Sequence, residues 1–394
     1  MTSDPGRRPA RRKAWAAAAA VLVLLAGAAG FGAWYGSDQA IGVVRHGSGN
    51  TRVLAVQGDL VTLERSARTG KPGTYWLEWS GASSMLGDVV SRTKGGVTRR
   101  LLRGQTPSVG TSGYFGNVPA GDPKIAWGIG HSEIMVPTEL GPAPAWYVPG
   151  EGPVWVVAVH GQNGHRKAEL KILPVVHELR LPFLDISYRN DEGAPPSPDG
   201  LLHLGDSEWR DLEAALRQAQ KMGAKRFVLY GTSMGGQIIG QFLARSPLAA
   251  ATDRVIMDAP MLDVGITGEQ GARNHHLPGF AGTLANKVVE WRTGVDVDRL
   301  SLIRHPPKIR PPLLLLHTVP DEEHPIEESR AFVAAAERLG WKVRFEEFAQ
   351  GEHTEAWNVD RVRYEGLVRG FLSRPWPEAM PPSDRRTARP TSGR

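Results

Sequence analysis

The chain has 394 residues, of which 41% are hydrophobic, so it can build one large folded domain or two of ordinary size. Its formal net charge is +6, but much of the excess lies in the terminal segments RRPARRK and DRRTARPTSGR rather than along one predicted face. This distribution argues against a nucleic-acid-binding groove. There are no cysteines, which excludes a disulfide framework, a thiolate nucleophile and a cysteine-based zinc site.

The N-terminus has the composition of a membrane segment. A basic stretch at residues 1–13 precedes an uncharged run at residues 14–36, in which Trp34 and Tyr35 lie where interfacial aromatic residues are enriched. Because cationic residues precede the run, we expect an uncleaved anchor with the short N-terminus in the cytoplasm and the remaining chain outside it. The alternative is a signal peptide cleaved near Ala26-Gly27-Ala28, which would give a secreted protein.

Residues 41–130 contain short β-like runs, such as TRVLAV and TYWLEW, separated by clusters of glycine, serine, threonine and proline. No strong helical period is present in this stretch, so we expect a β-rich N-terminal extension. At the other end, residues 375–394 are rich in proline, arginine and serine and are predicted to form a disordered tail.

Residues 131–374 alternate short apolar strands with amphipathic helices, which indicates an α/β domain with a mainly parallel sheet. Residues 262–300 interrupt the alternation and are interpreted as a lid-like insertion. The expected helices cover residues 167–179, 207–222 with Ser207 as N-cap, 235–245 and 327–339. The expected strands are SEIMVPT, PAWYVP, VWVVAVH, PFLDISY, RFVLY, RVIMD, LLLLHT and VRFEEF.

The segment LYGTSMGG lies between the strand RFVLY and an amphipathic helix. Here Gly231 and Gly235 flank Ser233 in the pattern G-x-S-x-G, which in a strand, turn and helix context presents a serine hydroxyl on a sharp turn. The glycines let the helix and the neighbouring strands approach without a Cβ clash. Ser233 is therefore the predicted nucleophile, and the alternative is a tight structural turn.

A serine hydroxyl is a weak nucleophile near neutral pH and needs a general base that a carboxylate orients. In the required order, Asp321 follows the strand LLLLHT and His353 follows VRFEEF, so we assign them as acid and base. The other acids considered are Glu322, Asp258 and Asp263, while His317, His324, His275 and His276 are weaker rivals for the base and are interpreted as structural polar residues.

The oxyanion of a tetrahedral intermediate needs donors that are already aimed at it. The strand VWVVAVH ends in the glycine-rich turn HGQNG, which can direct a main-chain N–H toward the serine. The predicted donors are the backbone N–H groups of Met234 and Gln162, and His160 is interpreted as a structural loop residue. No metal or cofactor is implied, because the sequence has no H-E-x-x-H pattern and this hydrolysis needs none.

Taken together, the predicted site resembles the α/β-hydrolase superfamily, and within it the serine hydrolases with an H-G-x-x-G loop and a G-x-S-M-G-G elbow. The resemblance covers residues 132–373 and looks most similar to actinobacterial hydrolases with an N-terminal membrane segment. It implies an α/β-hydrolase fold and places His353 in the histidine loop before the final helix. The segments that carry it are HGQNG, DISYRNDEGAP, GTSMGG, TVPDEEHP and GEHTEAWNVD.

These features predict a serine hydrolase that cleaves a small-molecule or lipid carboxylic ester through an acyl-enzyme. Ser233 would attack the carbonyl, His353 would take and return the proton, and Asp321 would stabilise the imidazolium. An ester is preferred over an amide on base rates and on membrane proximity. The alternatives are acyl transfer or peptide hydrolysis by the same triad, or a non-catalytic envelope-binding module that uses the β-rich extension as its binding surface.

Overall fold

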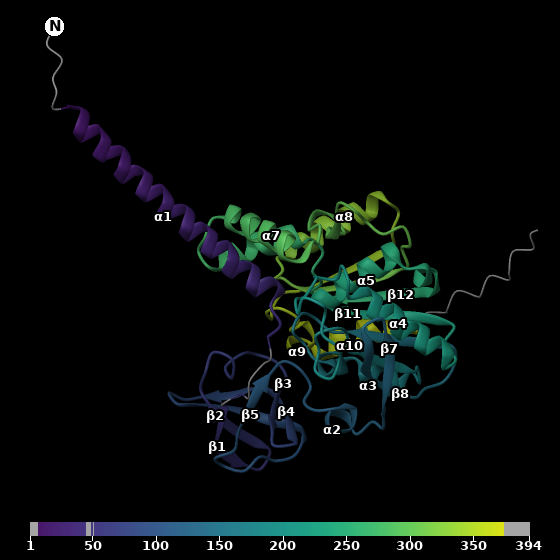
Figure 1. Cartoon of the computed structure of the whole chain (residues 1–394). Helices are drawn as coiled ribbons and strands as arrows, with labels where there is room; N and C mark the ends of the chain where they lie inside the picture. The colour runs from purple at the N-terminus through teal and green to yellow at the C-terminus, as the bar shows by residue number, and fades with distance from the viewer. Residues whose placement is uncertain (1–6, 45–48, 50, 374–394) are drawn as a thin grey trace, which may run out of the picture.

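The computed structural model describes residues 7–44, 49 and 51–373. An N-terminal helix, α1 (Arg7–Ile41), leads into a small β-barrel and then into an α/β domain (Figure 1). Within the described residues, no helix combines the length and apolarity needed to cross a membrane, so the anchor at residues 14–36 stays a prediction. The predicted tail at residues 375–394 and the first six residues of the basic segment lie outside the described residues.

The β-rich extension is a closed six-stranded barrel in the order β1-β2-β5-β4-β3-β6, and each pair of neighbours is antiparallel. Arg99 is fully buried in it. Its guanidinium lies 5.1 Å from the ring centroids of Tyr75 and Phe115 and donates to backbone carbonyls, which compensates the buried charge. The strands are β1 (Thr51–Gln57), β2 (Leu60–Glu64), β3 (Tyr75–Trp79), β4 (Ala82–Arg92), β5 (Gly96–Gly104) and β6 (Ser112–Gly116).

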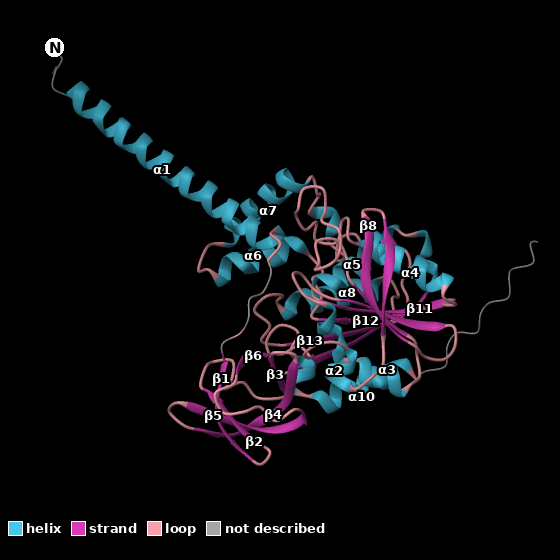
Figure 2. Ribbon diagram, turned by 60° about the horizontal axis from the view of Figure 1, so that its bottom comes forward, coloured by secondary structure: helices cyan, strands magenta, loops and turns pink. Residues whose placement is uncertain are grey.

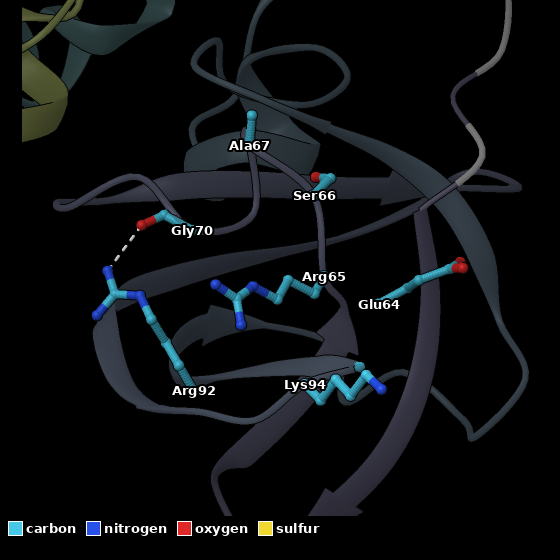
Figure 3. Close-up of a pocket in the computed structure, with 8 residues that line it drawn as sticks. Glu64, Arg65, Ser66, Ala67, Gly70, Arg92 and Lys94 are labelled. Atoms are coloured by element: carbon cyan, nitrogen blue, oxygen red, sulfur yellow. Dashed lines mark hydrogen bonds between the residues drawn. The ribbon is translucent and has the colours of Figure 1, made fainter.

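A cavity of about 660 Å³ opens on the barrel (Figure 3). Its two arginine side chains are held by backbone carbonyls: Arg65 donates to Thr93 O at 2.9 Å and Arg92 to Gly70 O at 2.8 Å. None of its lining residues is a histidine, so it lacks the base that a serine nucleophile needs. The lining residues are Glu64, Arg65, Ser66, Ala67, Gly70, Arg92, Lys94 and Gly95.

The predicted mainly parallel sheet is confirmed. Eight strands lie in the order β14-β13-β12-β11-β9-β10-β8-β7; those from β14 to β10 are parallel, and β8 and β7 add an antiparallel edge. Because side chains alternate along a strand, Phe227 and Leu229 join one core while Val228 and Tyr230 join the other. The strands are β7 (Ser132–Thr138), β8 (Gly141–Val148), β9 (Val154–Val159), β10 (Phe183–Ile186), β11 (Arg226–Thr232), β12 (Thr252–Asp258), β13 (Leu313–Thr318) and β14 (Val343–Phe348).

Helices cover both faces of the sheet. Side chains of α4, α5 and α8 pack into one core, and those of α3 and α10 pack into the other. Two helices, α6 and α7, occupy the predicted lid-like insertion at residues 262–300 (Figure 2). The described helices are α2 (Pro123–Trp127), η1 (Arg166–Lys171), α3 (Leu173–Glu178), α4 (Trp209–Lys221), α5 (Met234–Arg245), η2 (Pro247–Ala251), α6 (Val264–Asn274), α7 (Gly279–Thr293), η3 (Asp298–Leu300), α8 (Ile326–Arg338), α9 (Ala356–Val359) and α10 (Arg361–Leu372).

The predicted N-cap of α4 was wrong by one residue. The helix begins at Trp209, and Glu208 rather than Ser207 occupies the N-cap. The Ser207 hydroxyl lies 2.8 Å from His203 Nδ1, while the buried Glu208 carboxylate accepts the N–H groups of His203 and Gly205. Glu208 thus stabilises the turn before α4, and the Ser207 hydroxyl contacts His203 instead of capping the helix.

The C-terminal end of α1 packs on the α/β domain beside α7 (Figures 1 and 2). Trp34 and Trp291 lie edge to face with their ring centroids 6.2 Å apart. The Arg292 guanidinium lies 4.4 Å from the Trp34 ring and donates to Ser37 Oγ at 2.8 Å. Ile41 is fully buried in the core of the α/β domain, so this end of α1 is part of the folded domain.

Candidate active site

Ser233 occupies the sharp turn between β11 and α5. Its backbone has φ 52° and ψ −123°, a conformation that is strained for any residue other than glycine. Three hydrogen bonds hold the turn: the Ser233 N–H donates to Asp258 O at 3.0 Å, and the Ser233 carbonyl accepts from Gly236 N–H at 2.9 Å and Met261 N–H at 3.1 Å. Hydrogen bonds to the backbone N–H and carbonyl of Ser233 therefore hold the strained conformation in place. This is the geometry expected of a serine that a turn exposes as a nucleophile.

The glycines of the turn are required by close backbone contacts. A Cβ on Gly231 would lie 2.7 Å from the Gly235 carbonyl carbon, and a Cβ on Gly235 would overlap the carbonyl oxygen of Val159 on β9. These residues let α5 begin directly against the sheet, which brings its N-terminus beside Ser233.

Gly235→Ala is expected to lower the free energy of unfolding by about 1–3 kcal/mol, because the new methyl group forces α5 away from β9. Gly366→Ala is the matched control, since Gly366 lies exposed within α10 with no atom near its Cβ position. The control should raise stability by about 0.5–1 kcal/mol. Chemical denaturation of both variants measures the difference, and equal stabilities would contradict the steric explanation.

The structure brings Asp321 and His353 together. Asp321 Oδ2 lies 2.8 Å from His353 Nδ1 and 3.1 Å from His317 Nε2. Burial opposes ionisation of Asp321, but the neighbouring histidines, His353 first, hold its pKa well below the usual range. Burial also opposes charge on His353, yet Asp321 raises the pKa of this imidazole above its ordinary value. The carboxylate thus orients His353 and stabilises its protonated form, as the orienting acid of a triad does.

Two of the other acids considered pair with basic side chains. Asp258 Oδ2 pairs with Lys171 Nζ at 2.6 Å, and Asp263 Oδ2 pairs with Arg304 at 2.7 Å. Glu322 is exposed. Among the acids considered from the sequence, Asp321 is therefore the one whose carboxylate contacts the imidazole of His353.

His324 contacts Ser233, the predicted nucleophile, and the sequence interpretation missed this contact. Its Nε2 lies 3.3 Å from Ser233 Oγ and its Nδ1 lies 3.1 Å from Thr267 Oγ1 of α6. The rings of His324 and His353 are 4.7 Å apart between centroids and nearly perpendicular, at 76°. His353 Nε2 is buried and has no hydrogen-bond partner among the described residues. The Ser233 hydroxyl thus contacts an imidazole that was not predicted to meet it, and the predicted base, His353, packs against that imidazole.

The loop after β9 lies against Ser233. A Cβ on Gly161 would lie 2.9 Å from Ser233 Cβ. The Gly161 carbonyl accepts from Tyr188 OH at 2.8 Å and from Gly164 N–H at 3.1 Å. Because N–H and C=O point in opposite directions across a trans peptide, the Gln162 N–H lies on the side away from Tyr188.

The second predicted donor, Met234 N–H, belongs to the first residue of α5 and has no acceptor within its own helix. Because α5 begins directly after Ser233, the positive end of the helix dipole lies beside this residue. The donor roles of Met234 and Gln162 remain predictions. His160 is buried, with Nε2 2.8 Å from Asp191 Oδ2, which fits the structural role expected for it.

The side chains of the same loop bind the end of α1. Gln162 Nε2 donates to Gln39 O at 3.1 Å and to Ala40 O at 3.0 Å. Asn163 Nδ2 donates to Gly42 O at 3.0 Å. Carbonyls at a helix C-terminus have no intrahelical donor and are free to accept these hydrogen bonds. The loop that carries a predicted oxyanion donor is thereby fixed to the N-terminal helix.

A buried polar network lies behind the elbow. Thr232 Oγ1 donates to Glu169 Oε1 at 2.6 Å, and burial raises the pKa of Glu169 to about 7. Nearby, Asp258 Oδ2 accepts from Lys171 at 2.6 Å and from Tyr364 OH at 2.8 Å. The sequence signal for this network is Asp258, a charged residue that directly follows the apolar run VIM at the end of β12.

The barrel contacts the loop that carries His353. Lys71 Nζ lies 2.6 Å from Glu352 Oε2 and 2.9 Å from Glu355 Oε1. Thr74 N–H donates to Asn358 O at 2.8 Å, and Asn358 Nδ2 donates back to Thr74 O at 2.8 Å. The barrel therefore supports the residues that flank the predicted base.

Lys71→Met is expected to lower the free energy of unfolding by about 1.5–3 kcal/mol, since Glu355 is left without its cation in a buried site. It should also lower kcat/KM for an ester by up to about 10²-fold, because the loop of His353 loses a support. Arg369→Met, which breaks the exposed pair with Glu178, is the control and should change neither quantity much. Full activity in a destabilised Lys71→Met protein would show that this contact does not position His353.

Two family models match the chain. Residues 199–373 match the Prolyl oligopeptidase family, and residues 52–116 match a domain of unknown function (DUF8805). A search of the curated proteins found no match.

Solved structures are similar to the chain as well. An esterase from Pyrococcus furiosus aligns with a TM-score of 0.53 and 20% identity, over 66% of this chain and 95% of that one. The acylaminoacyl peptidase of Pyrococcus horikoshii aligns with a TM-score of 0.53 and 14% identity, over 85% of this chain and 57% of that one. The fold is that of an α/β-hydrolase. Together with the family match, the fold supports a serine hydrolase, and the resemblance expected from the motifs is confirmed at this level.

Proposed function

We propose that the chain is a serine hydrolase that cleaves a carboxylic ester, with Ser233 as nucleophile and His353 as base. The observation that carries this proposal is the 2.8 Å contact of His353 with Asp321 at the same sheet edge as the strained turn of Ser233. β11, β13 and β14 are parallel, so the residues that follow them converge at their carboxyl ends.

In the proposed reaction, Ser233 Oγ attacks the acyl carbonyl while its proton passes to His353 Nε2. The negative charge that develops on the carbonyl oxygen is stabilised by the N–H groups of Met234 and Gln162. The protonated imidazole, held by Asp321, then donates its proton to the leaving alcohol. Water repeats the sequence on the acyl-enzyme and releases the acid.

An ester substrate is supported by the apolar surface of the lid. Leu277, Phe280 and Leu284 are exposed on the insertion, and such side chains suit contact with an acyl chain.

Peptide hydrolysis is the second candidate, because the matched family is named for oligopeptidases and an acylaminoacyl peptidase shares the fold. Acyl transfer to an alcohol uses the same acyl-enzyme.

A substrate panel distinguishes these activities. We expect the kcat/KM values for p-nitrophenyl esters of graded chain length to exceed those for acylated and proline-containing p-nitroanilide peptides. Higher values for the peptides would replace the ester proposal with peptidase activity. Formation of a new ester in the presence of an added alcohol would identify acyl transfer. Ser233→Ala serves as the blank for each substrate.

We further propose that residues 14–36 anchor the chain in a membrane with the α/β domain on the extracytoplasmic side, and secretion after cleavage is the alternative. The uncharged run supports this arrangement. So do the exposed aromatic side chains of Phe31, Trp34 and Tyr35 on α1. The N-terminal sequence of the mature protein and its recovery from membranes after carbonate extraction test the two forms.

A further inference from the structure

The Ser233 hydroxyl contacts an imidazole that carries no carboxylate. Ser233 Oγ lies 3.3 Å from His324 Nε2. His353 has its Nδ1 on Asp321 at 2.8 Å, so the free electron pair of its Nε2 is available to accept a proton. This nitrogen has no hydrogen-bond partner among the described residues, and Glu323 Oε2 lies 3.7 Å from it. Ser233 and His353, which the proposed reaction requires to share a hydrogen bond, are therefore not hydrogen-bonded to each other in this arrangement.

His324 accepts a hydrogen bond but is poorly suited to accept a proton. Its Nδ1 faces the hydroxyl of Thr267 at 3.1 Å rather than a carboxylate. Burial, and then the neighbouring His353, hold the pKa of His324 well below its ordinary value. A neutral ring with Nδ1–H directed at Thr267 leaves Nε2 to accept from the Ser233 hydroxyl. Its geometry thus favours binding the hydroxyl over activating it.

This histidine also links the nucleophile to the lid-like insertion. Thr267 lies on α6, and Asn274 at the end of the same helix donates to Glu322 O at 2.6 Å. Two residues of α6 thus contact the short segment between Asp321 and His324. A displacement of α6 would break the Thr267 contact and loosen the position of the His324 ring.

We propose that His324 is a positioning residue that holds the Ser233 hydroxyl away from His353 in the resting enzyme, and that loss of its contact with Thr267 on α6 releases the hydroxyl to His353. The exchange replaces one hydrogen bond by another and breaks no covalent bond. It rests on the proposed function, because it takes Ser233 as the nucleophile and His353 as its base.

The test compares His324→Leu, Thr267→Val and His353→Ala in the full chain. The measurements are the second-order rate of labelling by a small fluorophosphonate and the pH profile of kcat/KM for a short p-nitrophenyl ester. His324→Leu should accelerate labelling about 2- to 10-fold, the effect of losing one neutral hydrogen bond, without moving the acid limb of the profile. Thr267→Val, which keeps the imidazole, should act in the same direction but less strongly. His324→Gln retains an acceptor and should accelerate labelling less than His324→Leu.

Two outcomes overturn the proposal. A loss of 100-fold or more in His324→Leu, with activity retained in His353→Ala, would make His324 the base. Labelling rates unchanged in both His324→Leu and Thr267→Val would show that the contact does not restrain the serine. Failure of the proposed function looks different, because labelling would then persist in Ser233→Ala. Thermal unfolding of each variant establishes that it is folded. If His324→Leu does not fold, the labelling rate of Thr267→Val decides the question.

Discussion

Ser233→Ala is expected to lower kcat/KM for a short p-nitrophenyl ester by about 10⁴- to 10⁶-fold, the size of effect seen when the nucleophile of a serine triad is removed. The turn places this one hydroxyl in contact with His324, whose ring packs against that of His353, and next to the start of α5. A methyl group cannot form the acyl-enzyme, whereas binding of the substrate and the backbone donors remain. The measurement is steady-state hydrolysis, with a fluorophosphonate probe to count reactive serines.

Ser108→Ala is the control for this experiment, because Ser108 is exposed on the barrel. Its turnover and labelling should match those of the unaltered protein. Substantial turnover in Ser233→Ala, or a probe adduct on any other residue, would remove Ser233 from the proposed mechanism. A folded protein without any labelled serine would favour the alternative of a non-catalytic binding module.

Asp321→Asn is expected to lower kcat/KM by about 10³- to 10⁴-fold, because an amide does not stabilise the imidazolium that forms during proton transfer. The pH profile gives a second readout. His353 must be neutral to act as a base, so activity falls as the pH decreases through its pKa. Asp321 raises that pKa while burial lowers it, so the acid limb of the variant should move to lower pH.

Glu322→Gln separates the two neighbouring acids. Glu322 is exposed and Asp321 is buried against His353, so the substitution at residue 322 should leave kcat/KM and the acid limb within about twofold of the unaltered protein. The reverse pattern, with a large effect at residue 322 and a small one at Asp321, would move the role of orienting acid to the adjacent carboxylate.

The parts of this molecule that the sequence predicts are those in which local pattern decides structure. The eight expected strands are present, and along the inner strands the apolar residues alternate between two cores, as Val228 and Leu229 do. The turn at Ser233 was predictable because two glycines and the flanking elements encode it within a few residues. Asp321 and His353 were chosen by requiring a chemical order at strand ends, and the structure places them in contact, while their roles as acid and base remain predictions.

The rest of the site depends on contacts that no local pattern encodes. His324 reaches Ser233 Oγ across 91 positions of the chain. Lys171 reaches Asp258 across 87 positions of the chain. Lys71 of the barrel likewise pairs with Glu352 and Glu355 in the loop of His353, so this contact joins two domains. In each case the side chain looks like an ordinary surface or turn residue until the fold brings its partner near.

The burial of Ile41 changes where the α/β domain begins. Ile41 packs in the core of that domain, and its carbonyl accepts the Leu202 N–H at 2.9 Å, although the barrel at residues 51–116 separates it in sequence from β7. The α/β domain is thus discontinuous in sequence, and the barrel is inserted between its first segment and its sheet. A shortened chain made to study the enzyme in solution must keep residues 33–41, because starting at β7 would remove part of the core together with the carbonyls that Gln162 binds.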